Sequence, residues 1–174
     1  MAASVASNLT GLCRALVQQG LLGQDEGETL QAQAKAASES IVAHLVRTKR
    51  FRPTQLATFS SITYGLPFLD LDALDPAVIP SGVVDYKLID KHRVIPLAKR
   101  GNRLYLGVSD PSNLQVLDDV KFQTGLAVEL VVLEEDKLAH YLEKNVESGR
   151  EDILKSIDTD DLNLEFTDDE AQSA

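Results

Sequence analysis

The chain has 174 residues and a net charge of −10; 44% of its residues are hydrophobic and 25% are charged. This length suits one domain with a full core or two small domains, and the composition is that of an ordinary globular protein. The acidic balance, the absence of tryptophan and an aromatic content of 5% argue against a nucleic-acid partner. Such binding needs excess lysine and arginine together with exposed aromatic rings.

Cysteine content and hydropathy restrict the function classes further. Cys13 is the only cysteine, so the chain can form neither an internal disulfide nor a cysteine-rich zinc site, and we interpret Cys13 as a core thiol. No run of about 18 apolar residues occurs, and the N-terminus lacks the order of a signal peptide. We therefore expect a cytoplasmic protein without direct membrane insertion, peripheral at a membrane only through its partners.

The first 65 residues have the pattern of a small helical unit. Apolar residues at helical spacing predict a helix from Leu9 to Val17 that ends at Gly20. Further helices are predicted over about residues 28–37, 41–46 and 53–63, the last with Pro53 in its first turn. The positions expected to be buried in this last helix are Leu56, Phe59 and Thr63.

The second half changes from helical to mixed patterning. Pro80 is expected to open a helix that contains Val84 and Leu88. From residue 93 a period of two predicts strands over 93–97 and 103–108, joined by a hairpin turn at 99–102. A helix over 113–124, a central strand over 127–133 and a final helix follow. The inward positions predicted for these two helices are Leu114, Leu117 and Val120, then Leu138, Tyr141 and Leu142.

The expected fold class is therefore α+β, with an α/β second part. A helical N-terminal subdomain at 1–65 is followed by a connector with a helix at 66–92. A small three-layer-like α/β subdomain at 93–147 contains the hairpin, the crossover helix and the further strand. Residues 148–174 are predicted to be an acidic flexible linker or tail, because nine carboxylates face one lysine after Arg150. Within the tail, Leu162, Leu164 and Phe166 are either a short docking motif or part of a solvated segment.

The sequence offers no catalytic site. Neither a P-loop nor a dinucleotide-binding glycine pattern is present, and no two of His44, His92 and His140 have metal-ligand spacing. Asp110 is interpreted as shaping an Asp-Pro corner rather than as an acid or base. We predict no catalytic residue and no metal site.

A family resemblance rests on motifs that occur in order. These are "RVIPL" at 93–97, "NRL" at 102–104, "SDPSNL" at 109–114 and "LDDVKFQTG" at 117–125, preceded by "YGLPFLDLDAL" at 64–74. Together they resemble the N-terminal domain of the type IV pilus assembly and type II secretion ATPases, most closely the pilus extension ATPases, over about residues 9–145. The resemblance implies a homohexameric motor that drives pilin polymerisation at the inner membrane. Its ATP and Mg would bind downstream of Ala174, and this part of the chain is expected to hydrolyse nothing and to need no cofactor.

Some members of this family bind cyclic di-GMP through two helical repeats of the form RLGxxLVxxG. In the first repeat, Gly11 stands in the arginine position and Cys13 in a glycine position. In the second, Val42 and Lys49 replace both glycines. The arginine that would pair with phosphate and the close backbone approach are thus both lost.

Three interpretations of function follow from the resemblance. The first is a non-catalytic regulatory domain that docks a PilZ-type adaptor and inner-membrane platform proteins, with Leu12, Leu16, Phe51 and Arg52 as candidate partner contacts. The leucines could equally be core residues. The second is a direct cyclic di-GMP sensor, with Arg47, Lys49 and Arg50 as possible nucleotide contacts. The third is a secretion ATPase domain that docks to a cytoplasmic segment of a membrane protein.

Overall fold

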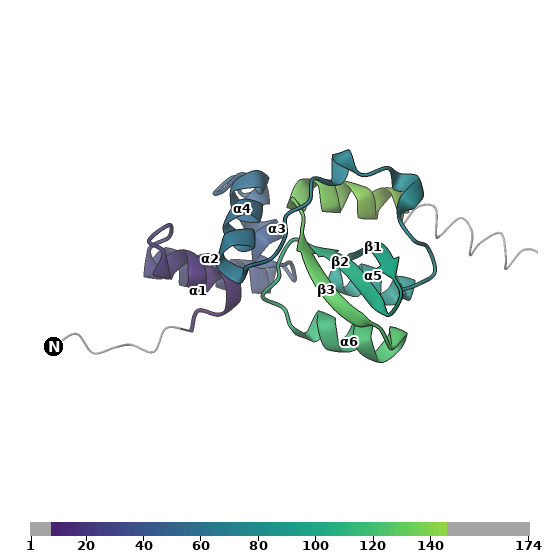
Figure 1. Ribbon diagram of the computed structural model, residues 1–174. Helices are drawn as coiled ribbons and strands as arrows, with labels where there is room; N and C mark the ends of the chain where they lie inside the picture. Colours follow the sequence, from purple (N-terminus) through teal and green to yellow (C-terminus); the bar gives the residue numbers. More distant parts are fainter. Residues whose placement is uncertain (1–7, 146–174) are drawn as a thin grey trace, which may run out of the picture.

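The computed structural model describes residues 8–145, and the fold is α+β, as predicted. A group of helices is joined to a small sheet that has helices on both faces (Figure 1). The helical unit comprises α1 (Gly11–Gln18), α2 (Gln24–Ala36), α3 (Ile41–Arg47) and α4 (Pro53–Tyr64). The remainder comprises short 3-10 helices η1 (Leu71–Ala73) and η2 (Pro76–Val78), α5 (Tyr86–His92), β1 (Ile95–Arg100), β2 (Arg103–Val108), α6 (Gln115–Thr124), β3 (Ala127–Val132) and an unlabelled helix over 135–145. The acidic segment predicted for 148–174 lies outside the described residues.

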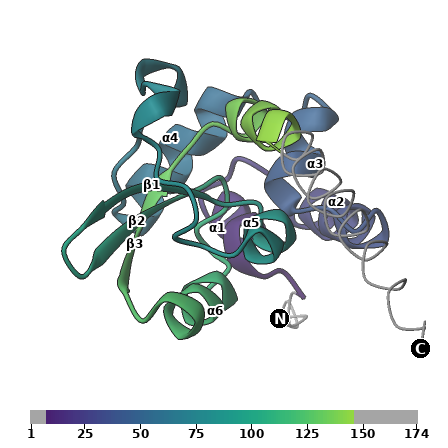
Figure 2. The same ribbon diagram turned by 90° about the vertical axis from the view of Figure 1, so that its right-hand side faces the viewer.

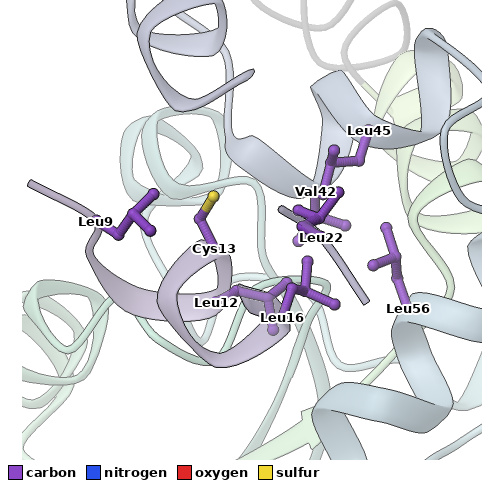
Figure 3. Packing of buried hydrophobic residues seen from close by; sticks show 8 residues of the cluster. All are labelled: Leu9, Leu12, Cys13, Leu16, Leu22, Val42, Leu45 and Leu56. Atoms are coloured by element: carbon purple, nitrogen blue, oxygen red, sulfur yellow. The ribbon is translucent and has the colours of Figure 1, made fainter. Parts of the chain in front are cut away.

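The helical unit has its own core. Six leucines and one valine from α1, α3, α4 and the segments on either side of α1 pack into one cluster, with Cys13 on the side nearest Leu9 (Figure 3). Cys13 is fully buried, which confirms its interpretation as a core thiol, and its Sγ donates to the Gly27 carbonyl at 3.3 Å. Burial raises the pKa of this thiol. The cluster consists of Leu9, Leu12, Cys13, Leu16, Leu22, Val42, Leu45 and Leu56.

Helices α1 and α3 end in the same backbone motif, 29 residues apart. After α1, Gly20 has φ of 73° and the Leu21 amide donates to the Leu16 carbonyl at 2.9 Å. After α3, Lys49 has φ of 58° and the Arg50 amide donates to the Leu45 carbonyl at 3.0 Å. This hydrogen-bond pattern is a Schellman motif, which needs a left-handed residue just past the helix. The chain thus contains two consecutive helix-turn-helix units, α1–α2 and α3–α4.

The sheet has the order β1-β2-β3, so the prediction that the third strand is central is wrong. β1 and β2 form the antiparallel hairpin, while β2 and β3 are parallel and connected through α6. The apolar sequence of β3 reflects helices on both faces of the sheet rather than strands on both sides. Its outer edge is covered by the connector, where the Val132 amide donates to the Pro67 carbonyl at 2.8 Å.

Two cores sandwich the sheet, which gives the three-layer arrangement (Figures 1 and 2). One core lies under α5 and α6 and includes Leu104, Leu106 and Val120. The other lies under helix 135–145 and includes Ile95, Leu133 and Leu138. The predicted burial of Leu138 and Leu142 is thus confirmed, and Tyr141 is half-buried.

Several predicted boundaries and faces need correction. The helix expected from Pro80 begins only at Tyr86, because Asp85 caps it by accepting from the Lys87 amide at 2.9 Å. Helix α2 begins at Gln24, four residues before the predicted start. In α6, Leu114 is 65% exposed and Val116 is buried in its place.

The face of α4 was also misplaced. Thr63 is exposed, and the buried positions are Leu56, Ala57 and Ser60. The predicted burial of Leu56 is confirmed, but the packed side of this helix continues through the small residues Ala57 and Ser60 rather than through Phe59 and Thr63. As a result, Phe59 is only half-buried and Ile62 points to solvent with 78% exposure.

The helical unit and the sheet unit meet at the Asp-Pro corner. The Asp110 carboxylate accepts from the Ser112 amide at 3.0 Å and from its hydroxyl at 2.5 Å, which confirms a turn-shaping role. Gly11 lies against this corner: a Cβ at Gly11 would be 2.6 Å from Ser112 Oγ. A second link joins Thr54 at the start of α4 to Glu134, with 3.3 Å between the hydroxyl and the carboxylate.

Candidate partner-docking groove

An apolar groove of about 570 Å³ runs along the exposed side of α4. One wall is α4 itself, and the other is formed by the end of α1 and the turn that follows it. The lining residues are Leu16, Leu21, Phe51, Arg52, Thr54, Gln55, Leu56, Thr58, Phe59 and Ile62. We call this feature the α4 groove.

The outer stripe of α4 explains why the groove is apolar. Gln55, Thr58, Phe59 and Ile62 follow the i, i+3, i+4, i+7 spacing of one helix face. Two of these residues, Phe59 and Ile62, are apolar, and Ile62 is 78% exposed. Leu21, from the turn after α1, adds a side chain that is 45% exposed. Contiguous exposed apolar surface of this kind marks interaction sites.

The basic residues near the groove fall into two groups. Arg47 pairs with Glu39 at 2.6 Å, and Arg50 pairs with Glu26 at 2.5 Å. Lys49 and Arg52, both exposed, have no carboxylate partner within residues 8–145. The Arg50 guanidinium also lies 4.9 Å from the centre of the Phe51 ring, which holds that ring at the groove.

The pairing of Arg47 is part of a local network. Glu39 Oε1 is 2.6 Å from Nδ1 of His44, a buried residue on α3, as well as from the Arg47 guanidinium. The hydrogen bonds from Arg47 and then His44 lower the pKa of Glu39 to about 2. Glu39 therefore neutralises much of the positive charge that Arg47 could offer to a phosphate.

The structure brings three of the four candidate partner contacts to the groove. Leu16, Phe51 and Arg52 line it, whereas Leu12 belongs to the core and lies outside this groove. Leu12 and Leu16 are both 0% exposed, so their placement favours the alternative that they are core residues. Leu16 forms the floor of the groove, whereas Phe51 is half-buried and Arg52 is exposed. Leu21 and Ile62 were not predicted as site residues, and Phe59 was predicted only as a buried position of α4; the structure places all three in the lining.

Cys13 and Lys49 are two positions at which the chain departs from the repeat RLGxxLVxxG. The side chain of Cys13 fills the contact between α1 and α2, where a Cβ on Gly27 would already lie 2.8 Å from Val17. No ligand can therefore approach the backbone at position 13 as it could at glycine. Lys49 keeps the left-handed backbone that glycine favours, so the second turn is retained although the residue has changed.

The histidines and carboxylates of the described residues form no metal site. Residues 8–145 contain no group of three histidine, cysteine, aspartate or glutamate side chains placed to hold a metal ion. His92 instead contacts Asp119 at 2.8 Å. Within the same range, no helix is long and apolar enough to cross a membrane.

Comparison with known proteins identifies the family of the chain. The family model described as the MshEN domain matches residues 64–152. The chain belongs to the MshEN domain family. The type IV pilus assembly ATPase PilB of Pseudomonas aeruginosa is 39% identical over 166 residues, and that of Acinetobacter baylyi is 33% identical over 156 residues. The match covers 94% and 90% of this chain but only 29% and 26% of those ATPases, so the chain spans less than a third of their length.

Solved structures share the fold of this MshEN-family chain. MshE solved with cyclic di-GMP has a TM-score of 0.57 at 21% identity and covers 78% of this chain and 99% of that one. The N-terminal domain of XpsE has a TM-score of 0.59 at 22% identity and covers 76% of this chain and 91% of that one. The predicted resemblance to the N-terminal domains of pilus and secretion ATPases is thereby confirmed.

Proposed function

We propose that this MshEN domain is the non-catalytic, regulatory part of a type IV pilus assembly ATPase and that the α4 groove binds a PilZ-type adaptor. In the whole protein, a hexameric motor would bind ATP and Mg and work with platform proteins at the inner membrane. The similarity to PilB supports the pilus assignment. The observation that supports docking is the exposed apolar surface at the end of the α4 stripe, where Ile62 is 78% exposed.

The chemistry of the groove suits a protein better than a nucleotide. Aromatic and aliphatic side chains surrounded by polar ones form the centre of typical protein interfaces. Phe51, Phe59 and Ile62 provide that centre, and Arg52 and Gln55 lie at the edge. A cyclic dinucleotide needs cations for two phosphates, and Arg47 and Arg50 are already paired with Glu39 and Glu26.

Direct sensing of cyclic di-GMP is the second candidate function. The fold similarity to MshE, solved with that nucleotide, favours it. The first repeat argues against direct sensing. Gly11 provides no guanidinium for a phosphate, and the Cys13 side chain prevents a nucleotide from approaching the backbone at that position. We therefore expect the adaptor rather than the domain itself to respond to the messenger.

A pair of surface variants tests adaptor docking. Ile62→Glu places a charge in the apolar centre of the groove and should weaken adaptor binding at least about 30-fold, the effect of losing about 2 kcal/mol at a central contact. Phe122→Glu is the matched control, because Phe122 on α6 is 94% exposed and lies outside the groove. Calorimetric titration with a PilZ-type adaptor should show the loss for Ile62→Glu only. Equal affinities for both variants would show that the adaptor binds elsewhere.

A further inference from the structure

Charged residues distinguish the α4 groove from three other cavities of the described residues. Its lining contains Arg52 and no carboxylate. Three further cavities each include at least two carboxylates, among them Asp85 and Asp90 in one and Asp72 and Asp136 in another. The groove thus combines an apolar surface with the positive charge of Arg52 in a chain whose net charge is −10, and the exposed Lys49 lies two positions before the lining residue Phe51.

The sequence contains a segment with the complementary composition. Beyond residue 150, nine carboxylates and one lysine account for most of the net negative charge. Among them, Leu162, Leu164 and Phe166 alternate with Asn163 and Glu165. In an extended segment this spacing places the three apolar side chains on one face, with Asp160, Asp161, Asp168 and Asp169 on either side.

We infer that residues 160–169 of the chain itself occupy the α4 groove when no partner is bound. Leu162, Leu164 and Phe166 would contact Phe59 and Ile62, and the flanking carboxylates would face Lys49 and Arg52. The acidic segment would then compete with the adaptor. This inference rests on the proposed function only for its regulatory consequence, because the docking itself requires no adaptor.

The chain is long enough for this contact. Thr54 lines the groove and lies 3.3 Å from Glu134, which immediately precedes helix 135–145. At about 1.5 Å per residue, the end of that helix is only about 16 Å farther away. The sixteen residues between Asn145 and Leu162 can span up to about 55 Å when extended.

Photo-crosslinking in the full 174-residue chain tests the contact directly. Benzoylphenylalanine is incorporated at position 166, and mass spectrometry locates the crosslinked peptides. We expect an intramolecular product within residues 51–62 that decreases at least about threefold with Arg52→Glu or in 1 M salt, because the flanking contacts are electrostatic. The probe at position 122 is the control and should give no product with the groove.

Three results would overturn the inference: no intramolecular product, a product at other residues, or a product of about twice the 19.0 kDa chain, which would mean contact between copies. A separate titration uses Leu162→Ser/Leu164→Ser/Phe166→Ser and should show about 3- to 10-fold tighter adaptor binding. Unchanged adaptor affinity together with a groove crosslink would refute the competition alone. Absence of adaptor binding together with a groove crosslink would refute the proposed function and leave the contact established.

Discussion

At the scale of single residues, Lys49 has a backbone conformation that glycine adopts more readily. Its φ is 58°, and the equivalent residue after α1 is Gly20 with φ of 73°. A left-handed conformation costs a non-glycine residue about 1–2 kcal/mol, partly offset by the lower freedom of its unfolded chain. We expect Lys49→Gly to raise the free energy of unfolding by about 0.5–1 kcal/mol and Gly20→Lys to lower it. Urea denaturation measures both, and a less stable Lys49→Gly variant would contradict this interpretation.

Glu39 provides a pH-dependent prediction. The Arg47 and His44 contacts lower its pKa from 4.5 to about 2. A carboxyl whose pKa is lower in the folded state stabilises the fold above its unfolded pKa, and this stabilisation is lost as the pH falls through the folded pKa. Stability from this group should therefore decline between about pH 5 and pH 2. Glu39→Gln should flatten that part of the curve of unfolding free energy against pH, and an unchanged slope would contradict the assignment.

At the scale of secondary-structure elements, β2 depends on a close contact at Gly107. A Cβ at this position would lie 2.5 Å from Leu133 Cδ1 and 3.2 Å from Leu97 Cδ1. Because both leucines belong to the core under helix 135–145, Gly107→Ala should destabilise the fold by about 1–3 kcal/mol. A lower urea midpoint with an unchanged slope would show this, whereas an unchanged midpoint would mean that the leucines move aside at little cost.

Elements with strong local signals were predicted well. The helical spacing of Ile41, Val42, Leu45 and Val46 correctly predicted α3. The ends of α4 and α6 were predicted from Gly65 and Gly125, and both glycines have left-handed backbones in the structure. The central position of β2 could not be read from the chain, because apolar content reports burial and not strand order. The start of α5 was missed because the Asp85 cap outweighs the preference of Pro80 for a first turn.

The lining of the α4 groove was likewise predictable from the sequence only in part. Phe51 and Arg52 were selected because they follow the third helix, and the structure places both in the lining. Ile62 could be recognised as exposed only once Ala57 and Ser60 were known to face the core. Which side of α4 is covered depends on where the sheet unit packs, and no local pattern encodes that.

At the scale of the whole molecule, two repeated helix-turn-helix units are joined to a three-layer sheet unit. The repeat keeps both turns, including the left-handed residue after each of α1 and α3. It replaces the residues that would contact a nucleotide and leaves the last helix, α4, with an uncovered apolar side. This combination supports the proposal that the domain docks an adaptor rather than sensing the nucleotide directly.

The most direct test of this account is isothermal calorimetry of the chain against a PilZ-type adaptor and, separately, against cyclic di-GMP. We predict saturable binding of the adaptor and no binding of the nucleotide, because the arginine position is Gly11 and Cys13 blocks the backbone. Saturable binding of cyclic di-GMP without adaptor binding would contradict the account and identify the domain as the sensor.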